Sequence, residues 1–219
     1  MNLTCETTRW PIRHLLALLA TGALRPAGTA GGPDWTAGQQ ALLFASPQAG
    51  WPTGQLLAWN PHGTTADSVG RWRLLDGHRR AATTLALAAP GCSTGTGGLL
   101  RDLTADEPTY LPADDTGDHP TGHAADGGRY LPVNAMRSTM RSLAATRSLP
   151  PAMPRRAEQY VHHLVGAGFD VVALRGGSPA QVGAVCARLL PGRVDPAVVH
   201  TIATAGGVWP LRWPPSAAP

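Results

Sequence analysis

The stretch RWRLLDGHRRAATTLALAAP, residues 71–90, decides how the fold of this chain is interpreted. Its first five residues, RWRLL, predict a strand. Asp76 and Gly77 predict a turn, and the alanine-rich run over 78–89 predicts a helix. A strand that passes directly into a helix leaves the N–H groups of the first helical turn without partners inside the helix.

Three basic side chains, His78, Arg79 and Arg80, fall in the first turn of that helix. Cations at this end oppose the helix dipole and cost some tenths of a kcal/mol each. A bound phosphate would offset this cost, because it accepts hydrogen bonds from the N–H groups and from the guanidinium groups. The stretch therefore predicts an anion site at the turn.

Other polar side chains lie close to the same turn. Asp76 could orient an arginine, hold a metal ion or accept a hydrogen bond from a ribose hydroxyl. Thr83 and Thr84 follow one turn later and offer hydroxyl contacts. The alternative is that Arg79 and Arg80 are merely solvated and that Asp76 only caps the helix. Local chemistry leaves both interpretations open.

The composition indicates a globular protein with one domain. The chain has 219 residues, 43% of them hydrophobic, and a formal net charge of +4. This charge permits an anionic partner such as a nucleotide or DNA, although the arginines are scattered and form no basic block. The cysteines are too far apart for a disulfide framework, which favours a reducing, cytoplasmic setting; they are Cys5, Cys92 and Cys186.

The segment over 9–32 combines basic residues, a short apolar run and small residues, as a signal peptide does. Thr21 and Gly22 interrupt the apolar run, so we favour an amphipathic helix over 11–22. No segment is long enough to span a bilayer, and no membrane partner is expected.

Further elements follow from local patterns, and together they indicate an α+β fold without regular alternation of strands and helices. Thr36 with Gln39 has the spacing of a capping box, and Ser178 starts another helix with Pro179 and Gln181 behind it. Other helices are expected near 133–147, near 154–166 and from Asp195 onward, and other strands at 54–60, 109–112, 129–132 and 169–176.

Two more groups of residues invite interpretation. His119 and His123 lie among aspartates, which suits a metal ion. Their Gly- and Pro-rich segment fixes no common face, so a solvated loop is the preferred interpretation and no metal site is predicted. Four tryptophans are expected to pack together in the core, although the first of them could stack on a base; they are Trp35, Trp51, Trp59 and Trp72.

The run LLDGHRRAATTLALA resembles the Asp-Gly-Gln-Gln-Arg-x-Thr-Thr-Leu signature of the N-terminal domain of GmrSD-type restriction endonucleases. That family belongs to the ParB/sulfiredoxin-like group, in which a Gly-Glu/His-Arg-Arg stretch contacts a nucleotide triphosphate. DWTAGQQALLFASPQAGWPTGQLLAWN is similar to the upstream Trp, Gln-rich helix and x-Pro-x-Gly run of the family. YLPVNAMRSTMRSLAATRSLP and FDVVALRGGSPAQVGAVCARLLPGR resemble its later helices and strand.

The resemblance covers roughly 10–195 and implies a single ParB-like domain over 1–205 with a small mixed sheet and additional helices. A flexible loop is expected at 113–128 and a loose tail over 206–219. The implied function is binding of a nucleoside triphosphate, with magnesium, in a DNA restriction or defence system. Hydrolysis coupled to action on foreign or modified DNA is the implied activity, as in a type IV-like restriction endonuclease.

The resemblance also assigns site residues and partners. Catalytic roles are implied for Asp76, Arg79 and Arg80, and Pro52 matches the upstream run. The implied partners are DNA and a nuclease subunit or a second copy of the chain. The implied nucleotide-binding residues are Gly77, His78, Arg79, Arg80, Thr83, Thr84, Trp35, Gln39, Gly54 and Arg188.

The chain departs from the family pattern at several positions. Gly31 stands where the family has an arginine, His78 and Arg79 replace the two signature glutamines, and Leu190 replaces an asparagine. No H-N-H nuclease pattern is present. The alternative hypothesis is therefore a degenerate, non-enzymatic module that binds DNA or another protein.

Overall fold

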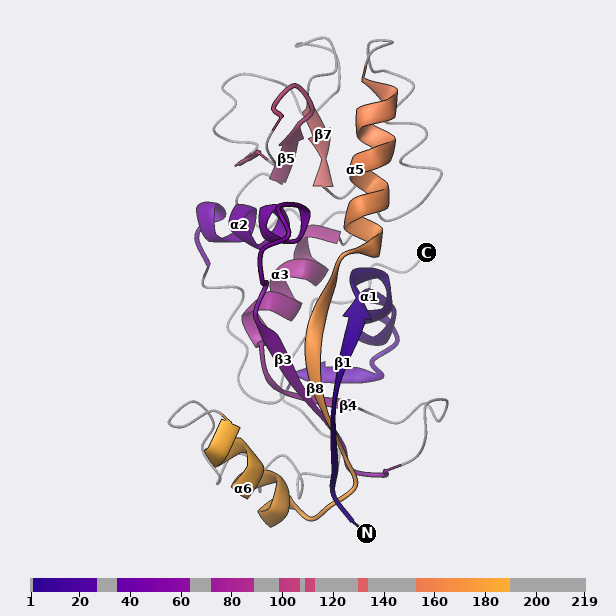
Figure 1. The fold of residues 1–219 in the computed structure, drawn as a ribbon, viewed down its shortest axis with the longest axis vertical. Coiled ribbons are helices and arrows are strands. Elements are labelled where there is room, and N and C mark those ends of the chain that lie inside the picture. The colour runs from indigo at the N-terminus through magenta and orange to yellow at the C-terminus, as the bar shows by residue number, and fades with distance from the viewer. Residues whose placement is uncertain are drawn as a thin grey trace.

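A five-stranded mixed sheet forms the centre of the protein (Figure 1). The computed structural model describes residues 2–26, 35–63, 72–88, 99–106, 109–112, 130–133 and 153–189. In the sheet, β8 pairs antiparallel with β1 and parallel with β3, and β4 pairs antiparallel with β3 and parallel with β2. The strands in spatial order are β1 (Thr4–Pro11), β8 (Gly168–Arg175), β3 (Gln55–Asn60), β4 (Trp72–Asp76) and β2 (Leu24–Pro26).

The central strands are buried on both faces, because apolar side chains point to alternate sides of a strand. In β3, Leu56 and Ala58 join one hydrophobic cluster, whereas Leu57 and Trp59 join another. The strand β8 divides its apolar residues between the same two clusters. The sheet therefore separates two cores.

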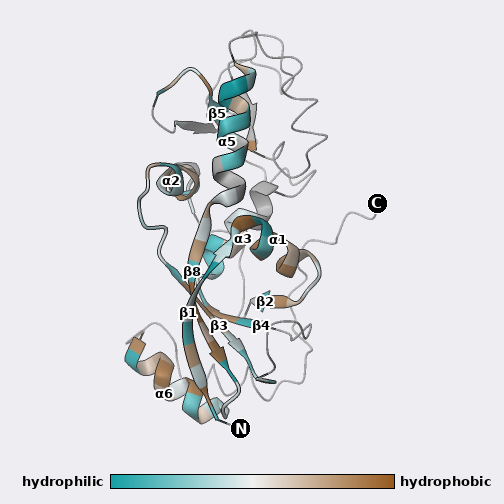
Figure 2. Cartoon of the chain, turned by 45° about the vertical axis from the view of Figure 1, so that its right-hand side comes forward, coloured by the Kyte–Doolittle hydropathy of each residue, from teal (hydrophilic) through white to brown (hydrophobic). Residues whose placement is uncertain are grey.

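Helices cover the two faces unequally. Side chains from α1 (Ile12–Ala20), α2 (Ala37–Gln48), α3 (His78–Ala88) and α5 (Pro154–Gly166) enter the larger core. Only α6 (Pro179–Leu189) contributes Val182 and Cys186 to the smaller core, among the described helices. Hydrophilic residues extend along much of α5, whereas the central strands are more apolar (Figure 2).

A second, three-stranded antiparallel sheet lies beyond α2, beside one end of α5 (Figure 1). Its order is β6 (Tyr110–Pro112), β5 (Leu99–Asp102) and β7 (Tyr130–Pro132). The helix α2 contacts both β6 and α5. Leu99 of β5 is buried in the larger core, so the small sheet packs onto the rest of the protein.

The α+β class is confirmed. Five strands and five helices lie where the sequence predicts them: β3, β4, β6, β7 and β8, and α1, α2, α3, α5 and α6. The strands β1, β2 and β5 were not predicted. Four predicted segments lie outside the described residues. They are the helix over 133–147 (beyond Val133), the helix after Asp195, the loop at 113–128 with His119 and His123, and the tail over 206–219.

The expected cluster of four tryptophans is wrong. Trp59 and Trp72 lie in different cores because their side chains point to opposite faces of the sheet. Trp72 instead makes an edge-on contact with Trp10, with the ring centroids 5.3 Å apart. Trp51 is 62% exposed, and Trp35 is partly buried against the larger core.

The N-terminal segment with the signal-like pattern forms α1, which is part of the fold. Leu15 is fully buried and Leu19 is 6% exposed in the larger core. In the part of the chain that the structure describes, none of the helices combines the length and apolar character that crossing a membrane requires.

Candidate functional site

The candidate site begins where β4 ends and α3 starts. Asp76 is the last residue of β4, and Gly77 joins it to the helix with a φ of +90°. This backbone conformation is unfavourable for any residue with a Cβ atom. A Cβ at Gly77 would also come within 2.2 Å of Leu56 Cδ2 on the neighbouring strand. Glycine is therefore required here both by the turn and by the close packing of α3 against β3.

Gly77 also shapes the chemistry of the helix start. Its carbonyl oxygen accepts the first helical hydrogen bond, from the Ala81 N–H at 3.0 Å. Glycine has no side chain that could accept hydrogen bonds from the N–H groups of the first turn. The start of α3 thus differs from the starts of α2 and α6, where Thr36 and Ser178 accept such bonds.

The Arg80 side chain connects α3 to the start of β3. Its guanidinium Nη2 donates a hydrogen bond of 2.6 Å to the carbonyl oxygen of Gln55. A Cβ atom at Gly54, whose φ is +78°, would lie 3.1 Å from Arg80 Nη1. Two stretches that lie in separate parts of the sequence are thus adjacent in the structure.

The other polar residues of the turn differ in exposure. Arg79 is exposed at the start of α3, and His78 and Asp76 are half-buried. An exposed guanidinium beside the positive end of a helix dipole suits an anion that approaches from solvent. Arg79 is therefore better placed than the half-buried Arg80 to contact such a ligand, because its side chain is exposed.

The two threonines of α3 do not face solvent. Thr83 is fully buried and Thr84 is 1% exposed. The Thr84 hydroxyl donates to the Arg80 carbonyl oxygen at 2.7 Å, a bond within the same helix. Neither hydroxyl therefore faces solvent at the start of α3, and the expected contacts to a phosphate stay a prediction.

Gln39 and Trp35 have structural roles of their own. Gln39 Oε1 accepts a hydrogen bond from the Thr36 N–H at 3.0 Å, and the Gln39 N–H donates to the Thr36 hydroxyl at 3.3 Å. These bonds confirm the capping box at the start of α2. The Trp35 carbonyl oxygen accepts from Gln40 Nε2 at 3.1 Å, while its ring packs against the larger core.

The last two residues that the resemblance implies, Arg188 and Pro52, are both exposed. Arg188 is exposed in the last turn of α6, on the face of the sheet opposite to α3. Pro52 is exposed in the segment that leads to Gly54.

Asp76 has an electrostatic effect on the smaller core. Cys186 of α6 is fully buried, and burial raises the pKa of its thiol from 9.0 to about 11. The negative charge of Asp76 contributes in the same direction, since it disfavours a thiolate nearby. This cysteine is thus unsuited to nucleophilic chemistry at neutral pH.

Sequence reasoning missed a second group of polar residues, which line a cavity of about 330 Å³ between α2, β5 and α5. No motif signals it, because its residues come from distant parts of the chain and none lies in a recognisable pattern. The polar residues include Gln48, Arg101, Asp106, Arg156 and Tyr160.

Neither the search for metal ligands nor the comparison with known proteins assigns a function to the chain. Within the described residues, no group of three or more His, Cys, Asp or Glu side chains is placed to hold a metal ion.

No protein-family model matches the chain, and no curated protein matches it. The resemblance to the GmrSD-type family therefore rests on the quoted stretches of sequence alone.

Proposed function

We propose that this chain is a ParB-like domain that binds a nucleoside triphosphate at the turn from Asp76 to Arg80, in a DNA restriction or defence system. The observation that carries the proposal is the contact between Arg80 and the Gly54–Gln55 backbone. It joins two of the stretches that resemble the family, although about 25 residues separate them.

Each residue of the turn has a defined role in this proposal. Arg79 would contact the phosphates from the exposed side of the helix start. Gly77 would bring the first-turn N–H groups of α3 toward a phosphate oxygen without an intervening side chain. Arg80 would act as a positioning residue, because its bond to Gln55 fixes the helix start against β3.

Magnesium, if it accompanies the nucleotide, would find one carboxylate at the turn, that of Asp76. Mg²⁺ in nucleotide sites takes one or two protein carboxylates and completes its octahedron with phosphate oxygens and water. The turn fits this pattern with Asp76 as the protein ligand. The ion would neutralise phosphate charge that the arginines do not reach.

A second function, a non-enzymatic module for DNA or protein binding, is favoured by one observation. Arg80 and Thr84 are both engaged in contacts inside the fold rather than presented to a ligand. Such a module would keep the turn for structural reasons and use Arg79 for a phosphate of DNA or an acidic partner. Its DNA binding would depend steeply on salt concentration.

The test is a thermal-shift screen of the whole chain with ATP, GTP, CTP and UTP in the presence of magnesium. A ligand at a hundred times its dissociation constant stabilises the native state by about 2.7 kcal/mol. We expect one nucleotide to stabilise the wild type and to lose its effect in R79A. The matched control is R155A, which removes another exposed arginine, on α5.

Two results would count against nucleotide binding. One is the absence of a shift with every nucleotide, and the other is an equal loss of the shift in R79A and R155A. In either case a salt titration of DNA binding by the wild type and R79A decides whether the second function applies. R80A is a poor first variant, because it also removes the bond to Gln55.

A further inference from the structure

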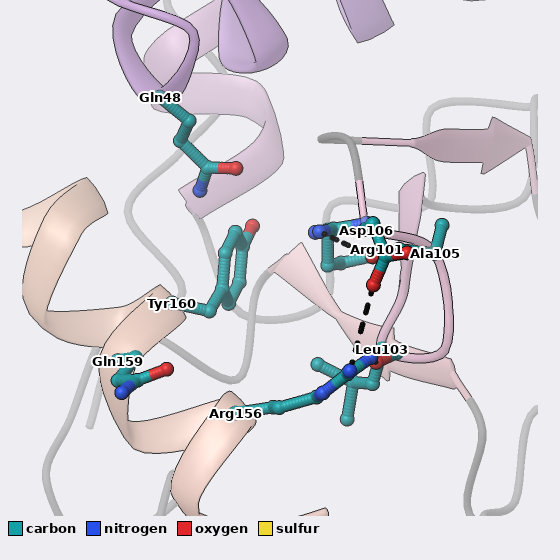
Figure 3. Close-up of a pocket in the computed structure, with 8 residues that line it drawn as sticks. All are labelled: Gln48, Arg101, Leu103, Ala105, Asp106, Arg156, Gln159 and Tyr160. Carbon is teal, nitrogen blue, oxygen red and sulfur yellow. Dashed lines mark hydrogen bonds and ion pairs between the residues drawn. The ribbon is translucent and has the colours of Figure 1, made fainter.

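The cavity between α2, β5 and α5 has the features of a small-ligand site that shares no residue with the turn at Gly77. Its volume of about 330 Å³ lies at the lower end of the range for ligand pockets. Figure 3 shows the Gln48 amide, the Tyr160 hydroxyl and the Arg101 guanidinium directed toward one common space. These side chains come from three separate elements, α2, α5 and β5.

Gln48 contributes a buried amide group to the inner wall of the cavity. Gln48 Nε2 is buried and has no hydrogen-bond partner within the part of the chain that the structure describes. A buried amide donor without a partner is costly, so native proteins almost always satisfy such groups. An acceptor atom supplied by a ligand in the cavity would satisfy it.

A cation is built into the same wall. Arg101 is only 8% exposed. Its guanidinium Nη1 donates to the carbonyl oxygens of Asp102 and Thr109, and Nη2 donates to that of Ala105 at 3.5 Å. Its Cζ lies 5.8 Å from the centre of the Tyr160 ring. These contacts fix the guanidinium in one orientation, so little entropy would be lost when a ligand binds to it.

The rim of the cavity carries a second cation. Arg156 Nη1 donates to the carbonyl oxygens of Leu103 and Thr104, and its Nη2 lies 3.5 Å from Asp106 Oδ1. The Asp106 side chain is 95% exposed, so it is free to move away from Arg156 when another anion arrives. The lining residues thus carry two positive formal charges and one negative charge.

We propose that this cavity binds a small oxyanion, a carboxylate or a phosphate group on a compact molecule. Donors dominate the wall: an amide N–H₂, a phenolic O–H and a guanidinium. Oxyanions accept several hydrogen bonds at once and are attracted by the net positive lining. The cavity shares no residue with the turn at Gly77, so this site does not depend on the proposed function.

The experiment is a thermal-shift and calorimetric titration of the full chain with two probes, inorganic phosphate and acetate, at constant ionic strength. We expect a saturable rise in the melting temperature with at least one probe, and the more effective probe identifies the oxyanion. In Q48L the half-saturating concentration should rise at least tenfold. Unliganded Q48L should melt no lower than the wild type, since the change removes an unsatisfied buried donor.

Two further variants keep the test decisive if Q48L does not fold. R156Q removes the rim cation and should weaken binding, whereas R155Q, its exposed neighbour outside the cavity, should not. R79A should leave oxyanion binding unchanged, which separates this site from the turn at Gly77. The proposal is overturned if neither probe gives a saturable shift, or if the cavity variants bind the probes as tightly as R155Q does.

Discussion

The Arg80 guanidinium donates a hydrogen bond of 2.6 Å to the Gln55 carbonyl oxygen, so the first turn of α3 is fastened to the first residue of β3. Gly54 packs closely against the same guanidinium, because a Cβ atom at this position would lie 3.1 Å from Arg80 Nη1. A glycine and an arginine thus form one contact that neither residue reveals in the sequence.

The substitution G54A should therefore destabilise the protein more than G50A. Both glycines have a positive φ, of +78° and +73°, but among the described residues no atom lies within 4 Å of a Cβ at Gly50. Backbone strain is common to both variants, and only G54A also displaces Arg80. We expect an excess loss of about 1 kcal/mol in urea unfolding, comparable to one hydrogen bond. In an R80A background the two glycine variants should cost the same, and a persistent difference there would contradict the contact.

G77A should be among the most damaging single changes in this part of the fold. It combines a φ of +90° with a Cβ only 2.2 Å from Leu56 Cδ2. Strain and overpacking each cost roughly 1–3 kcal/mol, so a loss of at least about 2 kcal/mol is expected. Combining G77A with L56A should cost less than the sum of the two single changes. Additive losses would show that Leu56 is not the obstacle.

Q39A should reduce stability without affecting nucleotide binding. Gln39 caps α2 through reciprocal hydrogen bonds with Thr36, so both Q39A and T36A should lower the free energy of unfolding, by about 1 kcal/mol for T36A. Chemical unfolding measures this loss, and the thermal-shift screen measures the binding. A variant that keeps full stability but no longer responds to a nucleotide would instead assign Gln39 to the ligand site.

Cys186 should react slowly with thiol reagents in the native protein. Its pKa, raised from 9.0 to about 11 by burial, reduces the thiolate fraction at pH 8 about 100-fold. Cys5 is exposed and serves as the internal reference. Alkylation at pH 8 followed by peptide mass spectrometry should label Cys5 first, with Cys186 labelled only after denaturation. Equal rates for the two cysteines would be inconsistent with a buried α6 face.

The same thiol should make stability fall at alkaline pH. Its pKa lies near 9.0 in the unfolded chain and near 11 in the native state, so the native state binds more protons between these values. The free energy of unfolding therefore decreases as the pH rises from 9 to 11. C186A lacks this dependence, so the stability difference between wild type and variant should shrink over that range. Parallel pH profiles would contradict the shift.

Local signals predicted much of the fold. The β-branched residues of FDVVALR indicated β8, and the polar residues at Thr36 and Ser178 marked the starts of α2 and α6. The strand β1 escaped prediction because it is an edge strand, with Thr4 through Thr7 all exposed. Its pairing with β8 depends on backbone hydrogen bonds, which do not require a particular pattern of side chains in the sequence.

In the candidate sites, too, some features follow from the local sequence and others follow from tertiary packing. The sequence by itself determined that a strand would turn into a helix at Gly77 with arginines in the first helical turn, since propensity and turn chemistry act over a few residues. Only the tertiary structure decided that Arg80 would hold Gln55, that Thr84 would be buried, and that Gln48, Arg101 and Tyr160 would meet around one cavity. Those relationships arise from packing between segments distant in the chain, and packing depends on which side chains the folded backbone brings together.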